Sequence, residues 1–310
     1  MQERKTNHRA VPVLAIVAVT IIWGLSFVSS KTILNAGVPP LTMAALRFLL
    51  TSAILGALLR IREPGGRIPA KVRLPLVASG LAGVTVYFFF ESRGIRLTSA
   101  SHASLIIATI PVFTVAAESL LYGTRIRWLA AVGIALSVAG TFLLVRGSVA
   151  AGTVAGDLFM FGACLAWVAY NMLSRDLYRS MSDLAITAWQ AIVGTAALVL
   201  LALTERRFWV PLTVPVILHL AFLAVFSSAV GNFLYVYGLS RLGPSVVAPF
   251  LNLVPVVSAI GGVVLLGERL DAWQIAGGVV IIGGVVLDRW RRGGPDAAAA
   301  AGFEESSPPG

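Results

Sequence analysis

A few ionisable side chains stand inside long apolar stretches of this 310-residue chain, among them Arg47, Glu91, His102 and Glu118. An ionisable group at the depth of a membrane costs roughly 2.5–3.5 kcal/mol on insertion scales, so it usually faces a partner or a wet cavity. Arg47 could bind a substrate carboxylate or pair with Glu91, or it could be a packing arginine whose charge snorkels outward. Glu91, His102 and Glu118 are candidates for proton coupling, because histidine and a desolvated carboxyl can titrate near neutral pH. The alternative for these three is a role in joining helices or at the membrane interface.

Two amides and two tryptophans in the same apolar stretches are further candidates for substrate binding. Asn252 and Gln190 could hydrogen-bond a substrate, or they could bond one another across helices. Trp23 and Trp167 could line an amphipathic cavity, although aromatic side chains near the ends of membrane spans are often interface anchors. Glu268, in a loop, is expected to be a structural cap or a member of an ion pair.

The composition explains why these groups are unusual. Hydrophobic residues make up 57% of the chain and charged residues only 12%, whereas soluble domains carry about 25% charged residues. The chain could not cover its own surface in water. Cys164 is the only cysteine, which excludes an internal disulfide framework and a cysteine-rich zinc site. The three histidines are scattered without ligand spacing, so we expect no metal and no cofactor.

The pattern of apolar runs predicts an all-α integral membrane protein. A helix needs about 20 mostly apolar residues to cross the hydrocarbon core, and the first run is too long for the core of a signal peptide. Ten segments of the chain qualify as transmembrane helices. They are Val11–Ser30, Leu41–Leu59, Leu74–Ser92, Ser99–Tyr122, Trp128–Val145, Ala155–Ser174, Leu184–Leu203, Val214–Tyr237, Pro244–Leu266 and Ala272–Leu287.

The positive charges predict the orientation of these spans. Most Lys and Arg residues fall in the loops on the same side as the N-terminus, and such loops are usually cytoplasmic. Ten spans then place both termini in the cytoplasm of a protein in the cell (inner or plasma) membrane. Residues 1–10 form a cytoplasmic N-terminal segment, and residues 289–310 are expected to be a disordered cytoplasmic tail. The net charge of +10 is therefore an orientation signal, and no nucleic-acid partner is expected.

The two halves of the chain match one another at a constant offset of 144 residues. Trp23 falls on Trp167 and Pro111 falls on Pro255, together with several glycines. We therefore expect two five-helix repeats, over residues 11–146 and 155–288. Because five is odd, the second repeat enters the membrane from the opposite side, and such inverted repeats are typical of secondary transporters with a binding site near the midplane. Pro111 and Pro255 interrupt backbone hydrogen bonding in equivalent helices, which makes them candidate hinges.

Several motifs resemble those of the drug/metabolite transporter (DMT) superfamily, specifically its EamA-like ten-helix transporters. The motifs are Trp23-Gly24-x-Ser26-Phe27, Pro40-x-x-x-Ala44-x-x-Arg47-Phe48, Pro255-Val256 and Gly267-Glu268-Arg269-Leu270, followed by Gly277 and Gly284. The resemblance spans roughly residues 11–288. Two positions depart from the pattern, because Thr124 replaces the glutamate in the first repeat and Val168 replaces the glycine after Trp167. The resemblance implies export or exchange of small metabolites, often amino acids, without identifying the solute.

Other classes of membrane protein fit the sequence less well. An ATP-driven pump would need a phosphate-binding loop, and the chain has none. An intramembrane enzyme would ordinarily show clustered acid, base or metal-ligating groups. The three histidines are scattered, so we expect that the protein is not an enzyme. A channel or a receptor-like component remains the alternative to a carrier that works by alternating access. The expected partners are a small-molecule substrate, membrane lipids and a coupling proton, with the protein a monomer or a homodimer.

Overall fold

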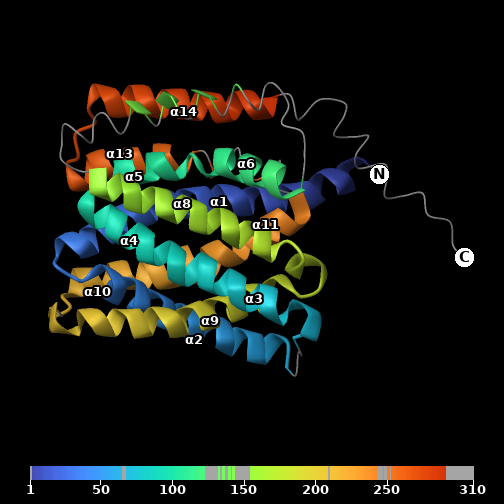
Figure 1. Ribbon diagram of the computed structural model, residues 1–310. Helices are drawn as coiled ribbons and strands as arrows, with labels where there is room; N and C mark the ends of the chain where they lie inside the picture. Colours follow the sequence, from blue (N-terminus) through green and yellow to red (C-terminus); the bar gives the residue numbers. More distant parts are fainter. Residues whose placement is uncertain are drawn as a thin grey trace, which may run out of the picture.

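The computed structural model describes residues 2–64, 68–122, 154–208, 210–242 and 253–290, with isolated positions between 132 and 143 and at 247, 250 and 251. Every regular element among these residues is a helix, as predicted for an integral membrane protein. Figure 1 shows the helices lying nearly parallel in one bundle, with α14 along its upper edge. We call the end of the bundle at which α1 finishes, at Asn35, the distal end. The opposite end, at which α2 finishes at Arg62, is the proximal end.

The helices follow one another along the chain in two sets. The first set is α1 (Gln2–Asn35), α2 (Pro40–Arg62), the 3₁₀ helix η1 (Ala70–Val72), α3 (Arg73–Gly80), the π-helical turn η2 (Leu81–Val86), α4 (Tyr87–Leu97), α5 (Ala100–Ile107) and α6 (Ile110–Tyr122). The second set is α8 (Val154–Ser174), the 3₁₀ helix η3 (Leu177–Arg179), α9 (Asp183–Ala202), the 3₁₀ helix η4 (Leu203–Phe208), α10 (Val214–Phe222), the π-helical turn η5 (Leu223–Val230), α11 (Gly231–Leu242), α13 (Val254–Leu266) and α14 (Ala272–Trp290).

Seven helical stretches in the described part of the chain are long and apolar enough to cross a membrane. Two shorter apolar helices follow, Val254–Leu266 and Ala272–Gly283. The predicted fifth span, Trp128–Val145, lies outside the described residues apart from isolated positions. In Figure 1, α14 ends at the same end of the bundle as α1 begins.

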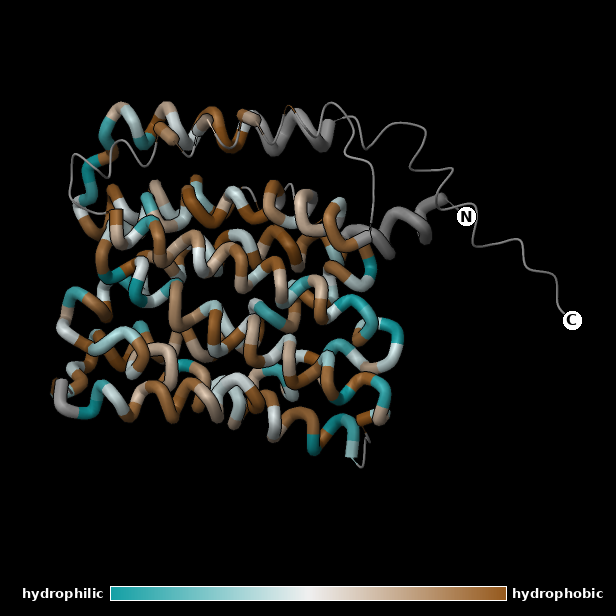
Figure 2. Tube along the Cα trace, viewed as in Figure 1, coloured by the Kyte–Doolittle hydropathy of each residue, from teal (hydrophilic) through white to brown (hydrophobic). Residues whose placement is uncertain are grey.

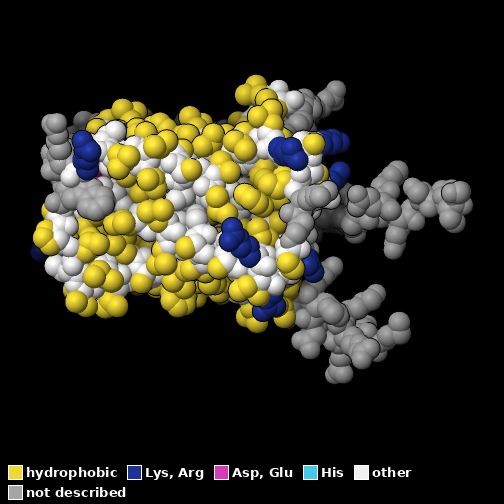
Figure 3. All heavy atoms as spheres, turned by 90° about the horizontal axis from the view of Figure 1, so that it is seen from below, with side chains coloured by type: hydrophobic (Ala, Val, Ile, Leu, Met, Phe, Trp, Pro, Cys, Tyr) yellow, Lys and Arg dark blue, Asp and Glu magenta, His cyan; other side chains and the backbone are white. Residues whose placement is uncertain are grey.

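The surface of the bundle is suited to lipid rather than to water. Figure 2 shows hydrophobic residues along the helices and hydrophilic residues mainly where the chain turns at the two ends. Figure 3 shows hydrophobic side chains covering the middle of one face, with Lys and Arg side chains toward its ends. Leu120 is 85% exposed and Val264 is 73% exposed. Such side chains have no favourable environment in water, and hydrocarbon provides one.

The helices pack mainly against helices of the other half of the chain. The largest interfaces join α2 to α9, α4 to α8, and α1 to both α13 and α11. Close approach depends on small residues at some crossings, as expected in a membrane. A Cβ atom on Gly24 of α1 would lie 2.5 Å from Cβ of Val257 on α13. The two halves therefore form one body with a shared core.

Both candidate hinge prolines stand at a break in a helix. The predicted span Ser99–Tyr122 is interrupted between α5 and α6, and Pro111 is the second residue of α6. Pro255 is likewise the second residue of α13. Proline lacks an N–H group and collides with the carbonyl four residues earlier, so it is best tolerated in the first turn of a helix, where both of these prolines stand.

Two π-helical turns were not expected from the sequence. They are η2 and η5, and each lies within a single membrane-spanning stretch, Ala70–Leu97 and Val214–Leu242 respectively. At the offset of 144 residues that relates the two halves, Leu81–Val86 falls on residues 225–230, inside η5. Turns of this kind are rare and often lie at functional sites, because they widen the helix and redirect side chains.

Candidate functional site

The guanidinium of Arg47 is buried in the middle of the bundle and bonded to η5. Arg47 is only 4% exposed, so its charge does not snorkel to the surface. Its Nε donates to Ser228 Oγ at 2.5 Å, and its Nη2 donates to Ser227 Oγ at 2.9 Å. Its Cζ also lies 4.6 Å from the centre of the Phe88 ring, a cation–π contact. The π-helical turn thus presents two adjacent hydroxyls to one buried cation.

Glu91 supplies a buried negative charge near Arg47. The residue lies on α4 and is 4% exposed. The Tyr87 hydroxyl lies 3.4 Å from Glu91 Oε1, while Glu91 Oε2 is buried without a hydrogen-bond partner. Arg47 and Glu91 attract one another electrostatically, but no ion pair within 4.0 Å joins these two described residues. A buried carboxylate oxygen without a donor costs free energy, and a donor that bound there would remove that cost.

Aromatic rings continue from this charge pair across the centre of the bundle. The Trp167 ring lies 5.1 Å from Tyr87, 5.7 Å from Trp23 and 5.8 Å from Tyr235, measured between ring centres. The Trp23 indole nitrogen donates to the backbone oxygen of Ser227 at 3.1 Å. The two tryptophans that lie 144 residues apart in the sequence are therefore in contact with each other. We call this group the central site; its members are Trp23, Arg47, Tyr87, Glu91, Trp167, Ser227, Ser228 and Tyr235.

The amide of Gln190 bonds to residues that are not members of the central site. Its side-chain nitrogen donates to Ser79 Oγ at 2.8 Å and to Ser174 Oγ at 3.0 Å. These bonds join α9 to α3 and α8. Asn252 lies outside the described residues. The backbone of Glu118 lies in α6, and its side chain is also outside the described part of the structure.

His102 lies at the distal end, in the first turn of α5. The residue is 1% exposed, and its Nε2 is 2.9 Å from Oδ1 of Asp157, which is also 1% exposed. Its Nδ1 lies 3.1 Å from the side-chain nitrogen of Gln274 at the start of α14. His102 therefore links three helices.

Glu268 caps the same turn of α5. A structural cap was one of the two roles expected for this residue from the sequence. Its Oε1 accepts from the backbone nitrogen of Ala100 at 2.7 Å, and its Oε2 accepts from the backbone nitrogen and hydroxyl of Ser101 at 3.1 and 2.6 Å. A carboxylate is favourable at a helix N-terminus because it pairs with free N–H groups. On the other side of the turn, Lys31 Nζ donates to the backbone oxygens of Ile95 and Thr98 at 3.0 and 2.5 Å, at the C-terminus of α4.

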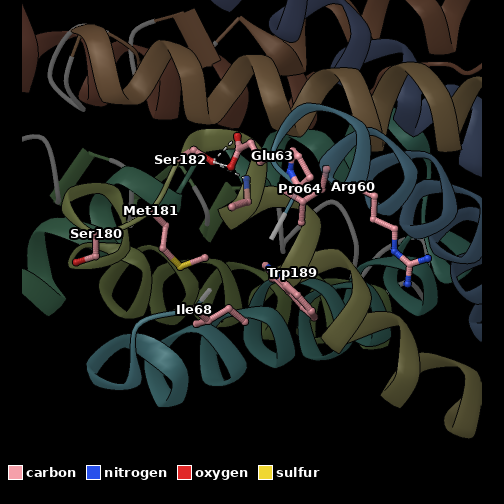
Figure 4. A pocket seen from close by; sticks show the side chains of 10 residues that line it. Arg60, Glu63, Pro64, Ile68, Ser180, Met181, Ser182 and Trp189 are labelled. Atoms are coloured by element: carbon pink, nitrogen blue, oxygen red, sulfur yellow. Dashed lines mark hydrogen bonds between the residues drawn. The ribbon is translucent and has the colours of Figure 1, made fainter. Parts of the chain in front are cut away.

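A separate cavity of about 500 Å³ lies near the proximal end, where α2 finishes. Figure 4 shows its lining, which includes Trp189 and the side chains of Glu63 and Ser182 pointing toward each other. Ser182 Oγ lies within 2.8 Å of both carboxylate oxygens of Glu63. Arg60 also lines this cavity. In Figure 4 its guanidinium points away from that pair.

Sequence reasoning missed several residues that the structure brings to these sites. Ser227 and Ser228 were overlooked because their importance depends on η5, although two adjacent hydroxyls in an apolar span are a usable signal. Asp157 was overlooked although it is an ionisable residue in the first turn of a predicted span. No group of three His, Cys, Asp or Glu side chains that could hold a metal occurs within the described ranges.

An all-helical membrane bundle with opposite charges buried among aromatic rings has the features of a membrane transporter. The family model for the EamA-like transporter family matches the chain twice, over residues 10–146 and 154–288. The chain belongs to this family, and it is a transporter.

Relatives along nearly the whole chain agree with this assignment. The chain is 29% identical over 296 residues to a "Probable amino-acid metabolite efflux pump" of Escherichia coli (strain K12), covering 90% of this chain and 96% of that protein. It is 27% identical over 278 residues to a "Probable terminal-alkyne amino-acid exporter" of Streptantibioticus cattleyicolor, covering 89% and 92%. A solved crystal structure shares the fold with a TM-score of 0.66 at 22% identity, over 92% of this chain and 99% of that chain.

Proposed function

We propose that the protein exports or exchanges amino acids or closely related small metabolites, and that it binds them at the central site. The names of two relatives, an amino-acid metabolite efflux pump and an amino-acid exporter, support this class of substrate. The observation that carries the proposal is the buried pair of Arg47 and Glu91, which are opposite in charge and not in direct contact.

An α-amino acid carries both charges that this pair requires. Its carboxylate can accept from Arg47, because a guanidinium has five N–H donors and the two serines take two of them. Its ammonium group can donate to Glu91 Oε2, the oxygen that has no partner in the empty site. Binding would then satisfy both buried groups at once, and this complementarity stabilises the complex without leaving an unpaired charge.

The aromatic rings of the central site suit the rest of such a substrate. Trp23, Tyr87, Trp167 and Tyr235 offer apolar faces next to the charge pair. An apolar or aromatic substrate side chain would bury its surface there, at roughly 25 cal/mol per Å² of apolar area. Trp23 and Trp167 therefore line the site in this proposal, as Arg47 does.

The transport cycle we propose is alternating access by two inverted five-helix repeats, over residues 11–146 and 155–288. Two observations support this cycle: one family model matches the chain twice, and the π-helical turns η2 and η5 lie at equivalent positions. In addition, α14 ends at the same end of the bundle at which α1 begins. Ten helices would place both termini on the cytoplasmic side of the cell membrane. The helix breaks at Pro111 and Pro255 would be the hinges.

Counterflow in proteoliposomes tests this function. Vesicles loaded with unlabelled phenylalanine should take up labelled phenylalanine in a saturable manner. They should discriminate against phenylalaninamide, which lacks the carboxylate, and against N-acetylphenylalanine, which lacks the ammonium group. Loss of a charged partner in a buried site costs about 2–5 kcal/mol, so each analogue should exchange at least about thirtyfold less well at low concentration.

Two substitutions assign the charges to residues. Arg47→Lys keeps the charge but loses the forked geometry, and Glu91→Gln removes the negative charge; both should abolish saturable exchange. Arg93→Lys is the matched control, because Arg93 lies on α4 with its guanidinium over Phe89 and outside the central site. If the two variants exchange phenylalanine as the wild type does, the central site is not where the substrate binds. Conductance without saturable exchange would instead indicate a channel.

A further inference from the structure

The distal end of the bundle converges on one short segment, the turn Ser99–His102 at the start of α5. Elements from the second half of the chain hold it from several sides. Glu268 caps its backbone N–H groups, and Ser258 Oγ of α13 donates to the backbone oxygen of Ala100 at 3.2 Å. Asp157 of α8 and Gln274 of α14 contact the His102 ring. Opening the distal end requires the second half to release this segment.

The protonation state of His102 follows from the orientation of Gln274. Gln274 and Asp271 form a capping box, in which Asp271 Oδ1 accepts from the Gln274 backbone nitrogen at 2.7 Å. In return, Gln274 Oε1 accepts from the Asp271 backbone nitrogen at 3.1 Å. The amide oxygen of Gln274 already accepts this hydrogen bond. The amide nitrogen of Gln274 therefore faces His102 and donates to its Nδ1. A ring nitrogen that accepts carries no proton, so the proton of a neutral imidazole lies on Nε2, beside Asp157.

A second proton on this pair would break contacts between the halves. Protonation of Nδ1 would place two donors face to face, 3.1 Å apart, and would push His102 away from Gln274. Protonation of Asp157 would remove the negative charge that attracts the Nε2 proton. Asp157 has no hydrogen bond to hold it otherwise, because neither of its oxygens meets a donor with good geometry. The arrangement in which α5 contacts both α8 and α14 therefore belongs to the pair with a single proton.

The other charges around the turn are committed to helix ends. Lys31 of α1 holds the C-terminal carbonyls of α4, including that of Arg96, at 3.2 Å. Glu268 caps α5, and Asp271 caps α14. Arg96 lies at the end of α4, and α13 has no ionisable side chain between Val254 and Leu266. These two cations and two carboxylates offset one another, so His102 and Asp157 are the groups beside this turn that are placed to respond to a proton.

We propose that His102 and Asp157 form a proton-binding site, at which a second proton releases α5 from α8 and α14 and opens the distal end. This proposal rests on the alternating-access cycle proposed above. Histidine is the side chain whose charge ordinarily changes between about pH 5 and 8. A proton taken up from the distal solution would then be exchanged for the substrate that leaves on that side.

Cys164 provides a readout that does not depend on transport. It is the only cysteine of the chain and is fully buried on α8, with Sγ 3.5 Å from the backbone oxygen of Ile106 on α5. Separation of α5 from α8 would expose it. A maleimide reacts with the thiolate, so its intrinsic rate rises with pH, whereas our proposal requires exposure to rise as the pH falls. The two effects have opposite signs.

The experiment measures maleimide labelling of Cys164 in the purified protein from about pH 5.5 to 8, divided by the labelling rate of N-acetylcysteine at each pH. In the wild type, this ratio should rise at least about tenfold toward acid, which corresponds to a shift of about 1.4 kcal/mol toward the open state. Asp157→Asn and His102→Gln should remove the pH dependence. His219→Gln on α10 is the matched control and should behave as the wild type does. A wild-type ratio that is independent of pH, or variants that keep the wild-type profile, would overturn the proposal.

Gln274→Glu keeps the proposal testable if removal of Asp157 prevents folding. A carboxylate at this position accepts a hydrogen bond from the protonated Nδ1 and holds the doubly protonated ring beside α14, so labelling should rise less toward acid pH than in the wild type. A variant that keeps the full wild-type rise toward acid pH contradicts the proposal. In proteoliposomes, wild-type substrate efflux should move protons that a trapped pH dye detects, and Asp157→Asn should exchange substrate without moving them. Absence of any exchange counts against the proposed function, while the Cys164 result decides the proton site.

Discussion

The cap that Glu268 places on α5 yields a prediction whose size follows from the structure. Its carboxylate accepts three hydrogen bonds, from Ala100 N, Ser101 N and Ser101 Oγ, at 2.7, 3.1 and 2.6 Å. Ala100 and Ser101 are both 0% exposed, so water cannot replace the lost acceptor in the folded protein. A buried donor left without a partner costs about 1–3 kcal/mol. Two such backbone amides predict that Glu268→Ala lowers the free energy of unfolding by about 3 kcal/mol.

Thermal unfolding in detergent measures this loss. A dye that fluoresces on reaction with Cys164 reports the exposure of the buried thiol on unfolding. About 3 kcal/mol should lower the Tm by about 5–10 °C in a chain of this size. Glu268→Gln retains one side-chain oxygen as an acceptor and should lose about half as much. Asp176→Ala removes an exposed carboxylate and should leave the Tm unchanged. A Tm for Glu268→Ala within about 1 °C of the wild type would refute the reasoning.

Two further predictions concern packing and the buried cation. Gly24→Ala should destabilise the bundle by about 1–3 kcal/mol, because the new Cβ would lie 2.5 Å from Cβ of Val257. Gly283→Ala is the control and should have the wild-type Tm, because its new Cβ would meet no atom within 4 Å. Ser228→Ala removes the acceptor of Arg47 Nε and should cost about 1–3 kcal/mol, measured by the same assay. An unchanged Tm for Ser228→Ala would mean that another acceptor replaces the hydroxyl.

Much of the fold could be predicted because it depends on local signals. Apolar runs of membrane length identify helices without any knowledge of their neighbours. The offset that relates Trp23 to Trp167 singled out two rings that prove to be in contact, 5.7 Å apart. Arg47 and Glu91 stood out because charge is rare in an apolar span, and both are buried in the structure.

The features that escaped prediction depend on contacts between distant parts of the chain. The π-helical turns leave no mark in hydropathy, so nothing indicated that η5 would present Ser227 and Ser228 to Arg47. The partners of His102 come from α8 and α14, and only the packing of these helices selects Asp157 and Gln274 among the polar residues nearby. Gln190 was open to two interpretations, and the neighbours that use its amide, Ser79 and Ser174, were not evident from its own span.

The packing of each half against the other also bears on how the protein is made. The largest interfaces join α2 to α9, α4 to α8 and α1 to α13. The helices of the first half are therefore synthesised before the helices against which they pack. At about 5–20 residues per second, the second half takes roughly 10–30 s to be synthesised. During that interval lipid, the insertion machinery or a chaperone must cover the faces that carry Arg47 and Glu91. Insertion of the chain is therefore separated from its assembly, and two halves produced as separate polypeptides should be able to combine into one transporter.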